Sequence, residues 1–205
     1  MKLYYTPGAC SLASHIALRE AGIGFDLARV DHATKTTEEG EDFLAVNPNG
    51  YVPALRMAEG GVLTEGAAIL QYIADKAPAA GLAPAAGTTE RYRLLEWLTF
   101  ISTELHKNFG PLFNPAAPEA YKDIAKASLA KRLAHVDRHL AAAGPYLLGE
   151  RFSIADAYLF TVSGWALYHK LDLTPYPALL AYRARVAARA AVQEALKAEG
   201  LLKAA

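Results

Sequence analysis

The sequence is poor in the features that mark secreted, membrane-spanning and nucleic-acid-binding proteins. It has one cysteine, Cys10, in 205 residues, so no disulfide can form within the chain. Lysine plus arginine and aspartate plus glutamate number 21 each, and this balance argues against nucleic acid or an anionic membrane as the main partner. The first residues lack the apolar core of a signal peptide, and the least charged stretch, 157–169, is too short and too polar to span a bilayer. A free thiol without an export signal predicts a cytoplasmic protein.

Several motifs of common enzyme classes are also missing. The sequence has no phosphate-binding glycine loop, no Gly-x-Ser-x-Gly elbow and no histidine spacing typical of a metal site. We therefore expect no metal. A redox Cys-x-x-Cys pair would need a cysteine at position 13, where the chain has Ala13. If Cys10 performs redox chemistry, an external thiol must complete the cycle.

The first 77 residues alternate between strand and helix patterns. Short apolar runs predict strands, and three- and four-residue apolar spacing predicts helices between them. The expected strands are 2–5, 25–30, 54–57 and 62–63, and the expected helices are 11–21, 41–46 and 67–74. The opening strand–helix–strand order favours a parallel pair with a right-handed crossover. The last two strands flank a Glu-Gly-Gly turn and indicate a hairpin.

A change in pattern after residue 77 indicates a second domain. Residues 78–88 carry Pro78, Gly81, Pro84 and Gly87 among alanines, which is typical of a linker. Beyond it the apolar spacing is helical throughout, and the expected helices are 91–110, 121–140, 153–171, 178–188 and a short C-terminal piece. We therefore predict an α/β domain over 1–77, a linker over 78–88 and an all-α domain over 89–205.

Cys10 lies where a strand and a Pro-Gly turn lead into a helix. Helix N-termini carry partial positive charge and free N–H groups, which stabilise a thiolate. We therefore expect the Cys10 pKa to lie below its ordinary value of about 8.5. The alternative is a small buried apolar residue, which is common for cysteine.

Two further patterns are candidates for a binding site. Thr99, Thr103 and His106 have i, i+4, i+7 spacing, so we expect them on one helix stripe with Lys107 beside it; the alternative is a solvated helix face. Glu65-Gly66 opens a helix whose free N–H groups could hold a carboxylate; the alternative is ordinary helix capping by Thr64.

Two other motifs have a structural interpretation. Val52-Pro53 follows a turn and precedes a strand, where a proline could be cis. Ser153-Ile154-Ala155-Asp156 has the spacing of a capping box, with aspartate in place of the usual glutamate, so we interpret it as a helix start that aids folding.

Taken together, five segments in order resemble the cytosolic glutathione transferases, and in particular the bacterial beta class, over essentially the whole chain. The segments are YYTPGACSLASHIALREAG, NPNGYVPAL, LTEGAAILQYIAD, FISTELHKNFGPLFNP and FSIADAYLF. The resemblance implies a thioredoxin-like N-terminal domain that binds glutathione, followed by an all-helical domain with the second-substrate pocket. It also implies a cytoplasmic homodimer that needs no cofactor beyond glutathione as co-substrate.

The resemblance implies roles for named residues. Cys10 would face the glutathione sulfur, with His106 as the second catalytic candidate. Val52, before a cis Pro53, would pair its backbone with the cysteinyl part of the tripeptide, and Glu65 with the Gly66 amide would hold the γ-glutamyl end. The remaining residues implied near glutathione or the second-substrate pocket are Tyr5, Ser11, Lys35, Thr103 and Lys107.

The implied reaction is attack by glutathione thiolate on a small hydrophobic electrophile, with reduction of mixed disulfides through Cys10 as a second activity. One departure is Gly66, where the family usually has serine: the backbone N–H remains but a hydroxyl is lost. Two alternatives stay open. One is a non-catalytic carrier of hydrophobic ligands or a regulatory module on the same fold; the other is a Cys-His hydrolase that uses His106 to activate Cys10.

Overall fold

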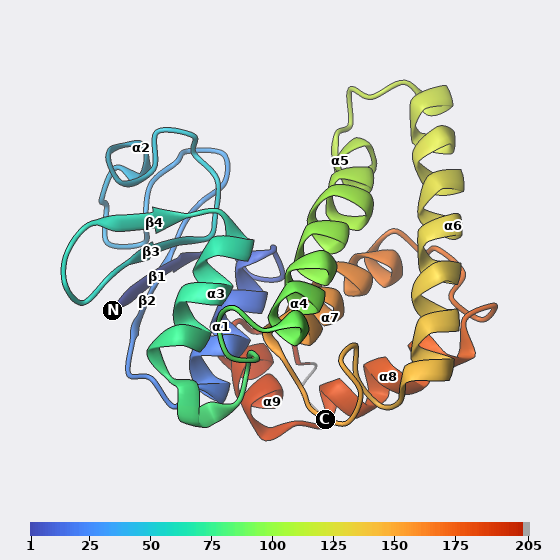
Figure 1. The fold of residues 1–205 in the computed structure, drawn as a ribbon. Helices are drawn as coiled ribbons and strands as arrows, with labels where there is room; N and C mark the ends of the chain where they lie inside the picture. The colour runs from blue at the N-terminus through green and yellow to red at the C-terminus, as the bar shows by residue number, and fades with distance from the viewer. Residues whose placement is uncertain (203–205) are drawn as a thin grey trace. The chain divides into compact units, whose positions relative to one another are not determined.

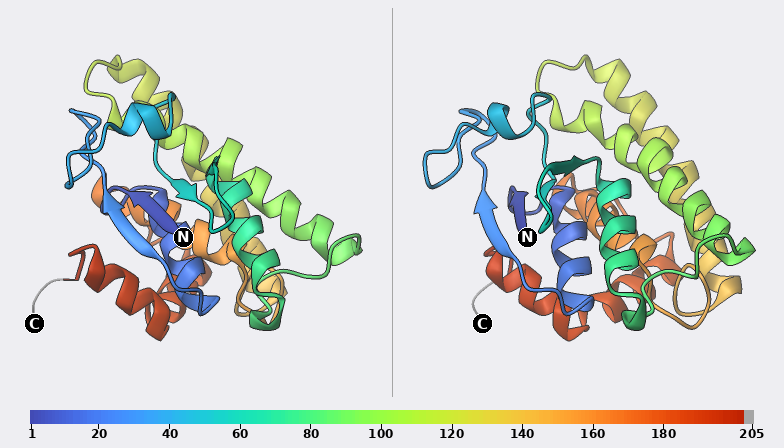
Figure 2. Two further views of the ribbon diagram at one scale, coloured as in Figure 1. Left: turned by 90° about the vertical axis from the view of Figure 1, so that its left-hand side faces the viewer. Right: turned by 60° about the vertical axis from the view of Figure 1, so that its left-hand side comes forward.

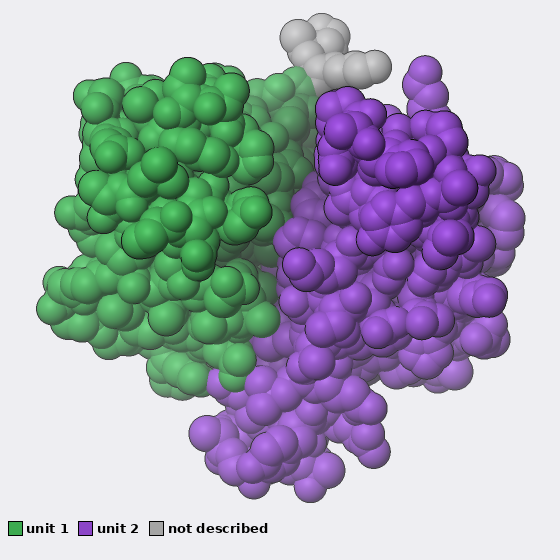
Figure 3. Space-filling model, turned by 90° about the horizontal axis from the view of Figure 1, so that it is seen from above, with its two compact units in different colours: residues 1–83, 188–205 green, residues 84–187 purple. Residues whose placement is uncertain are grey.

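The computed structural model describes residues 1–202 and divides into two compact units, which Figure 3 shows in different colours. The first unit contains residues 1–83 together with the described part of 188–205, and the second contains residues 84–187. The predicted all-helical domain, 89–205, differs from this division at its last segment, which packs with the first unit.

A four-stranded mixed sheet forms the centre of the first unit (Figure 1). Its strands are β1 (Lys2–Tyr5), β2 (Asp26–Arg29), β3 (Ala54–Arg56) and β4 (Val62–Thr64), in the order β2-β1-β3-β4. β1 and β2 are parallel, as the strand–helix–strand pattern predicts, and β3 and β4 form the expected antiparallel hairpin. β1 also pairs antiparallel with β3, with Tyr4 opposite Ala54.

In the described part of the first unit, four α-helices accompany this sheet. They are α1 (Ser11–Glu20), α2 (Phe43–Val46), α3 (Gly66–Lys76) and α9 (Ala190–Ala198), with a 3-10 turn at Pro78–Ala80. α1 packs against α3 and α9. Because side chains alternate across a strand, Tyr4 of β1 points to the opposite face from its neighbours and joins a buried cluster with Phe43, Val52 and Ala54.

A buried carboxylate contributes to holding the C-terminal segment in the first unit. Glu199, 5% exposed, accepts a hydrogen bond from the Gly8 backbone N–H at 2.9 Å and contacts His15 Nδ1 at 2.8 Å. Arg19 donates from Nε to the other His15 ring nitrogen at 2.9 Å. These contacts join the end of α9 to α1 and to the turn before Cys10.

The second unit is helical (Figures 1 and 2). Its helices are α4 (Thr89–Phe100), a π-helical segment (Ile101–His106), α5 (Lys107–Phe113), α6 (Glu119–Ala143), α7 (Ile154–Tyr168) and α8 (Pro177–Ala187). α7 is buried over most of its length and contacts α4, α8 and the π-helical segment. The prediction of a continuous α-helix over 91–110 is wrong in its middle, because the six residues 101–106 adopt the wider π-helical turn.

The capping box at the start of α7 is confirmed. Asp156 Oδ2 accepts hydrogen bonds from the Ser153 backbone N–H and hydroxyl, both at 2.8 Å. Its other oxygen accepts from the Leu147 N–H at 2.9 Å, so the same carboxyl group also anchors the preceding turn. Asp156 is fully buried, and these three hydrogen bonds explain why a carboxyl group is tolerated there in an otherwise apolar helix.

Within residues 1–202, no helix is both long enough and apolar enough to cross a membrane.

We predict that Asp156→Ala lowers the free energy of unfolding by about 3–5 kcal/mol, because it leaves two backbone N–H groups and a hydroxyl buried without an acceptor, each at about 1–3 kcal/mol. This exceeds the roughly 0.5–2 kcal/mol of an ordinary helix cap. Urea unfolding measures the difference. Asp123→Ala, which removes an exposed carboxylate paired with Lys126 on α6, is the matched control. Equal effects of the two changes would contradict the anchoring role.

Candidate active site

Three loops of the first unit meet at one end of the sheet because of the strand register. Tyr4 lies opposite Ala54, and Ala54 lies opposite Thr64. Since both pairings are antiparallel, the loop after β1, the loop before β3 and the segment after β4 all leave the sheet at the same end. These segments carry Cys10, Val52 and Glu65, which the sequence singles out as candidates.

Cys10 is the N-cap residue of α1, as its position in the sequence predicts. Its Sγ donates a hydrogen bond to the Val52 carbonyl oxygen at 3.1 Å. The thiol therefore contacts the loop before β3, at the residue that the family resemblance assigns to the cysteinyl part of glutathione.

The expectation of a lowered Cys10 pKa is wrong for this structure. Burial raises the pKa of the thiol to about 12, although part of the residue keeps some exposed surface. The N–H groups of Cys10 and Ser11 at the helix start act in the opposite direction but are outweighed, and the nearby Glu65 charge adds to the rise. The hydrogen bond to Val52 needs the thiol proton, so it also fits a neutral Cys10.

The peptide bond between Val52 and Pro53 is cis, which confirms that expectation. The Val52 backbone N–H makes no hydrogen bond within residues 1–202, so this group is available to a ligand. Lys35 lies beside the same loop: its ammonium group donates to the Gly50 carbonyl oxygen at 2.9 Å and lies 6.0 Å from the centre of the Tyr51 ring.

Glu65 stands before α3 in an unusual conformation. It has φ of 67°, a value that residues other than glycine seldom adopt, and it is the N-cap residue of the helix. Ordinary capping by Thr64 is contradicted, because Glu65 holds the N-cap position and no side chain caps this helix. The Gly66 N–H lacks a partner in the described chain, and the Glu65 carboxylate is exposed and equally unpaired. This helix start therefore offers both a donor and a carboxylate to a ligand.

Tyr5 and Ser11 lie deeper in the fold. Tyr5 is 7% exposed and its ring contacts His15. Ser11 is fully buried, and its hydroxyl accepts from the Thr6 N–H at 3.2 Å and donates to the Thr6 carbonyl at 3.3 Å. Both side chains are thus positioned to shape the loop that carries Cys10.

In the second unit, residues 101–106 are π-helical, so the i, i+4, i+7 spacing of Thr99, Thr103 and His106 does not by itself place the three on one face. Thr99 and Thr103 are exposed, and the Thr103 hydroxyl donates to the Thr99 carbonyl at 3.0 Å. His106 is half-buried instead. Lys107 is exposed next to it.

His106 is held by residues of α7. Its Nδ1 lies 2.7 Å from the Tyr158 hydroxyl, and its ring packs edge-on against Trp165 at 4.8 Å between centroids. Burial, and to a lesser extent the charge of Lys107, lowers the His106 pKa to about 4. The imidazole is therefore neutral at neutral pH. Tyr158 was not predicted as a site residue, since it lies inside the helix that the sequence marks for folding.

Among residues 1–202, no three His, Cys, Asp or Glu side chains are grouped so that they could hold a metal ion.

Comparison with known families agrees with this combination of a cysteine-bearing thioredoxin-like unit and a helical unit. Residues 8–76 match the sequence model of the glutathione S-transferase N-terminal domain, and residues 100–190 match that of the C-terminal domain. The chain belongs to the glutathione S-transferase family.

Several similar proteins come from bacteria. Glutathione S-transferase GstA of Escherichia coli O157:H7 is 51% identical over 98% of this chain and 100% of its own length. A sphingomonad glutathione S-transferase, solved in complex with glutathione, is 53% identical with a TM-score of 0.95, covering 98% of this chain and 100% of that one. A beta-class enzyme from Sphingomonas chungbukensis is 50% identical, with the same TM-score and coverage.

These relationships confirm the predicted beta class, the fold and the enzyme activity: the chain is a glutathione transferase, and enzymes of this family use glutathione as co-substrate. The same relationships do not favour the alternative of a non-catalytic carrier or regulatory module.

We predict that the Cys10 thiol of the ligand-free protein reacts slowly with iodoacetamide. Because its pKa is raised to about 12, the alkylation rate should rise about tenfold per pH unit between pH 7 and 10 without a plateau. Mass spectrometry at timed intervals measures the rate. The same protein in urea is the control and should level off near the ordinary cysteine pKa of about 8.5. A plateau below pH 9 in the folded protein would show that the helix start outweighs burial.

Proposed function

We propose that the first unit binds glutathione along the sheet end that carries Cys10, Val52 and Glu65. Glutathione has a carboxylate at each end, an amine at the γ-glutamyl end and a central thiol. The Gly66 N–H and the Glu65 carboxylate complement the γ-glutamyl carboxylate and amine. The unpaired Val52 N–H suits the cysteinyl backbone, and Lys35 suits the glycine carboxylate. Tyr5 and Ser11 act as positioning residues for the loop before Cys10.

The reaction we propose is conjugation of glutathione to a small hydrophobic electrophile. The glutathione sulfur, as thiolate, forms a new bond to the electrophilic carbon, and the leaving group departs with the bond electrons. Cys10 keeps its proton because its pKa is raised, so its S–H can donate to the glutathione thiolate in place of the Val52 carbonyl. The thiol-to-carbonyl hydrogen bond is the observation that carries this assignment.

The second unit supplies the groups for the electrophile. His106, neutral because of its lowered pKa, can accept or donate a hydrogen bond without carrying charge. Thr103 and Lys107 are exposed on the same segment, where their hydroxyl and ammonium groups can meet polar parts of the substrates. Phe113 provides an exposed apolar surface that packs on the buried Trp165, which in turn packs on the buried Phe109, in keeping with a hydrophobic second substrate.

Glutathione-dependent reduction of mixed disulfides through Cys10 is the second activity we propose. The high thiol pKa makes it slow in the ligand-free protein, because the thiolate is the attacking species. We further propose a cytoplasmic homodimer with a role in detoxification, as is typical of the family.

We predict that Gly66→Ser tightens glutathione binding by about 1 kcal/mol, because a hydroxyl adds a hydrogen bond at a helix start that receives a carboxylate. The site has room: a Cβ at Gly66 would lie 3.8 Å from Pro53 Cγ, an ordinary contact, and φ there is not positive. Calorimetry gives the Kd. Gly66→Ala, which adds the carbon without the hydroxyl, is the control. Equal Kd values for the two variants would contradict the placement of the γ-glutamyl carboxylate.

We predict that Cys10→Ala abolishes reduction of glutathione mixed disulfides but keeps part of the conjugation activity. Reduction needs the Cys10 sulfur as the atom that forms a new disulfide, and since Cys10 is the only cysteine, a second glutathione must release it. Conjugation uses the glutathione sulfur, which other donors stabilise in part. Both activities are measured in wild type and variant, with Cys10→Ser as the variant that keeps a donor. Full disulfide reduction by Cys10→Ala would remove Cys10 from that reaction.

A further inference from the structure

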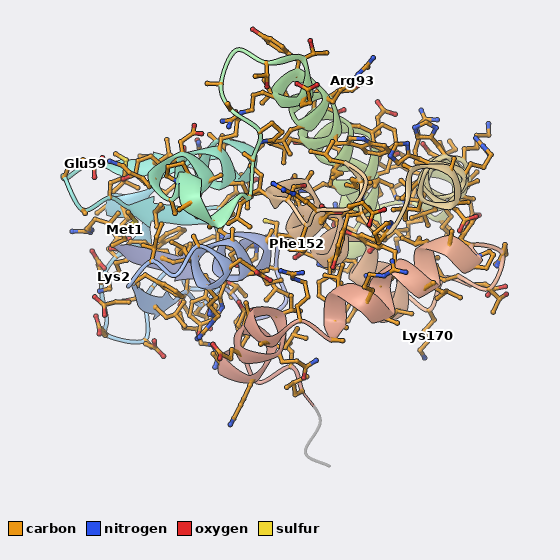
Figure 4. All side chains as sticks on the ribbon, turned by 60° about the horizontal axis from the view of Figure 1, so that its bottom comes forward. Met1, Lys2, Glu59, Arg93, Phe152 and Lys170 are labelled. Carbon is orange, nitrogen blue, oxygen red and sulfur yellow. The ribbon has the colours of Figure 1, made fainter. Side chains whose placement is uncertain are left out.

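One aromatic cluster of the second unit extends beyond the residues that the sequence singles out. It lies where α5 ends and where α7 ends; Figure 4 labels Phe152 and Lys170, which precede and follow α7. Phe113 packs edge-on against Trp165, with 5.3 Å between ring centroids, and stacks on Tyr168 at 5.8 Å. His169, the residue after α7, completes the cluster.

His169 carries an unsatisfied polar atom in these aromatic surroundings. Its Nε2 is buried and has no hydrogen-bond partner in the described chain. The imidazole lies 4.4 Å from the Phe113 ring at 72° and 5.0 Å from the Tyr168 ring at 90°, and it stacks on Phe109 at 6.2 Å. The aromatic rings that contact His169 thus belong to neutral side chains, which offer the His169 nitrogen only a weak π acceptor.

Two of the rings that contact this imidazole are exposed. Phe113 is 47% exposed and Tyr168 74%, although both side chains are large and largely apolar. Large exposed apolar side chains beside one another indicate a binding surface. An exposed phenylalanine at the end of a helix can change its rotamer at little expense, and a ligand ring that takes its place would reach the imidazole.

We propose that an aromatic ring of the second substrate takes the place of the Phe113 ring against Trp165 and Tyr168, and that His169 Nε2 donates a hydrogen bond to an oxygen substituent on that ring. His169 is then a specificity-determining residue, which favours ring-bearing electrophiles with a carbonyl or similar oxygen over purely hydrocarbon ones.

The chemistry of the cluster supports an uncharged oxygen acceptor. Burial lowers the His169 pKa, so the imidazole is neutral at neutral pH and offers no charge to attract a carboxylate. A conventional N–H···O bond is stronger than the N–H···π contact that it replaces. A hydrocarbon substituent would gain only ring contacts and would leave the nitrogen unsatisfied.

This inference rests on the proposed conjugation reaction, and its test separates the two. The substrates are 4-acetylbenzyl chloride and the nearly isosteric 4-isopropylbenzyl chloride; in both, glutathione sulfur bonds to the benzylic carbon and chloride leaves. The measured quantity is the ratio of the two kcat/KM values in each variant, corrected for the reaction without enzyme. His169→Phe keeps a flat ring but removes the nitrogen. His135→Phe, an exposed histidine on α6 of the same unit, is the matched control.

We expect His169→Phe to lower the acetyl-to-isopropyl ratio about tenfold, as loss of one hydrogen bond predicts, and His135→Phe to leave it unchanged. An unchanged ratio in folded His169→Phe overturns the specificity role while the conjugation reaction stands. Absence of conjugation of both chlorides by the wild type overturns the proposed function and this inference with it.

A second measurement does not depend on the variant. In the ¹⁵N-labelled wild type, the His169 Nε2 chemical shift should move on binding S-(4-acetylbenzyl)glutathione and much less on binding the isopropyl analogue. Equal shifts with the two products would contradict the proposed hydrogen bond, whether or not His169→Phe folds.

Discussion

The contact between the Cys10 thiol and the Val52 carbonyl depends on the pairing of β1 with β3. That antiparallel register brings the start of α1 and the loop before β3 to one end of the sheet, and the pairing of β3 with β4 adds Glu65 to them. A one-residue slip in either pairing would turn the attached loops to other positions. The short sheet thus fixes where three otherwise separate segments of the chain meet.

The chemistry of the site depends on which of its polar groups have hydrogen-bond partners within the protein. The Cys10 thiol proton has an acceptor within the protein, whereas in the described chain the Val52 and Gly66 N–H groups have no acceptor and the Glu65 carboxylate has no donor. Backbone groups left without partners are seldom found inside folded proteins unless a ligand or water satisfies them. The unusual φ of Glu65 places the same helix start among conformations that are typical of functional sites.

Much of this arrangement could be predicted from the sequence, because its signals are local. The strand–helix order, the hairpin turn and the capping box at Asp156 each follow from residues close together in the chain. The π-helical turn could not be predicted, since an apolar spacing of three and four residues at Leu98, Ile101 and Leu105 is also typical of an α-helix. The Cys10 pKa was mispredicted because a helix start is visible in sequence, whereas the burial that outweighs it arises from residues far along the chain.

The contact of Glu199 with Gly8 spans 191 positions of sequence and makes the first unit discontinuous. During synthesis, the segment that carries Gly8 and Cys10 emerges from the ribosome well before Glu199, which supplies the acceptor for the Gly8 N–H. Until Glu199 is synthesised, His15 Nδ1 lacks its carboxylate partner, and the face of α1 that packs against α9 carries an unsatisfied polar group. Cleavage at the linker would therefore separate the first unit from part of its own structure, because the N-terminal fragment would lack α9, which packs against α1. A circularly permuted chain in which α9 is joined ahead of β1 would keep both segments of this unit together.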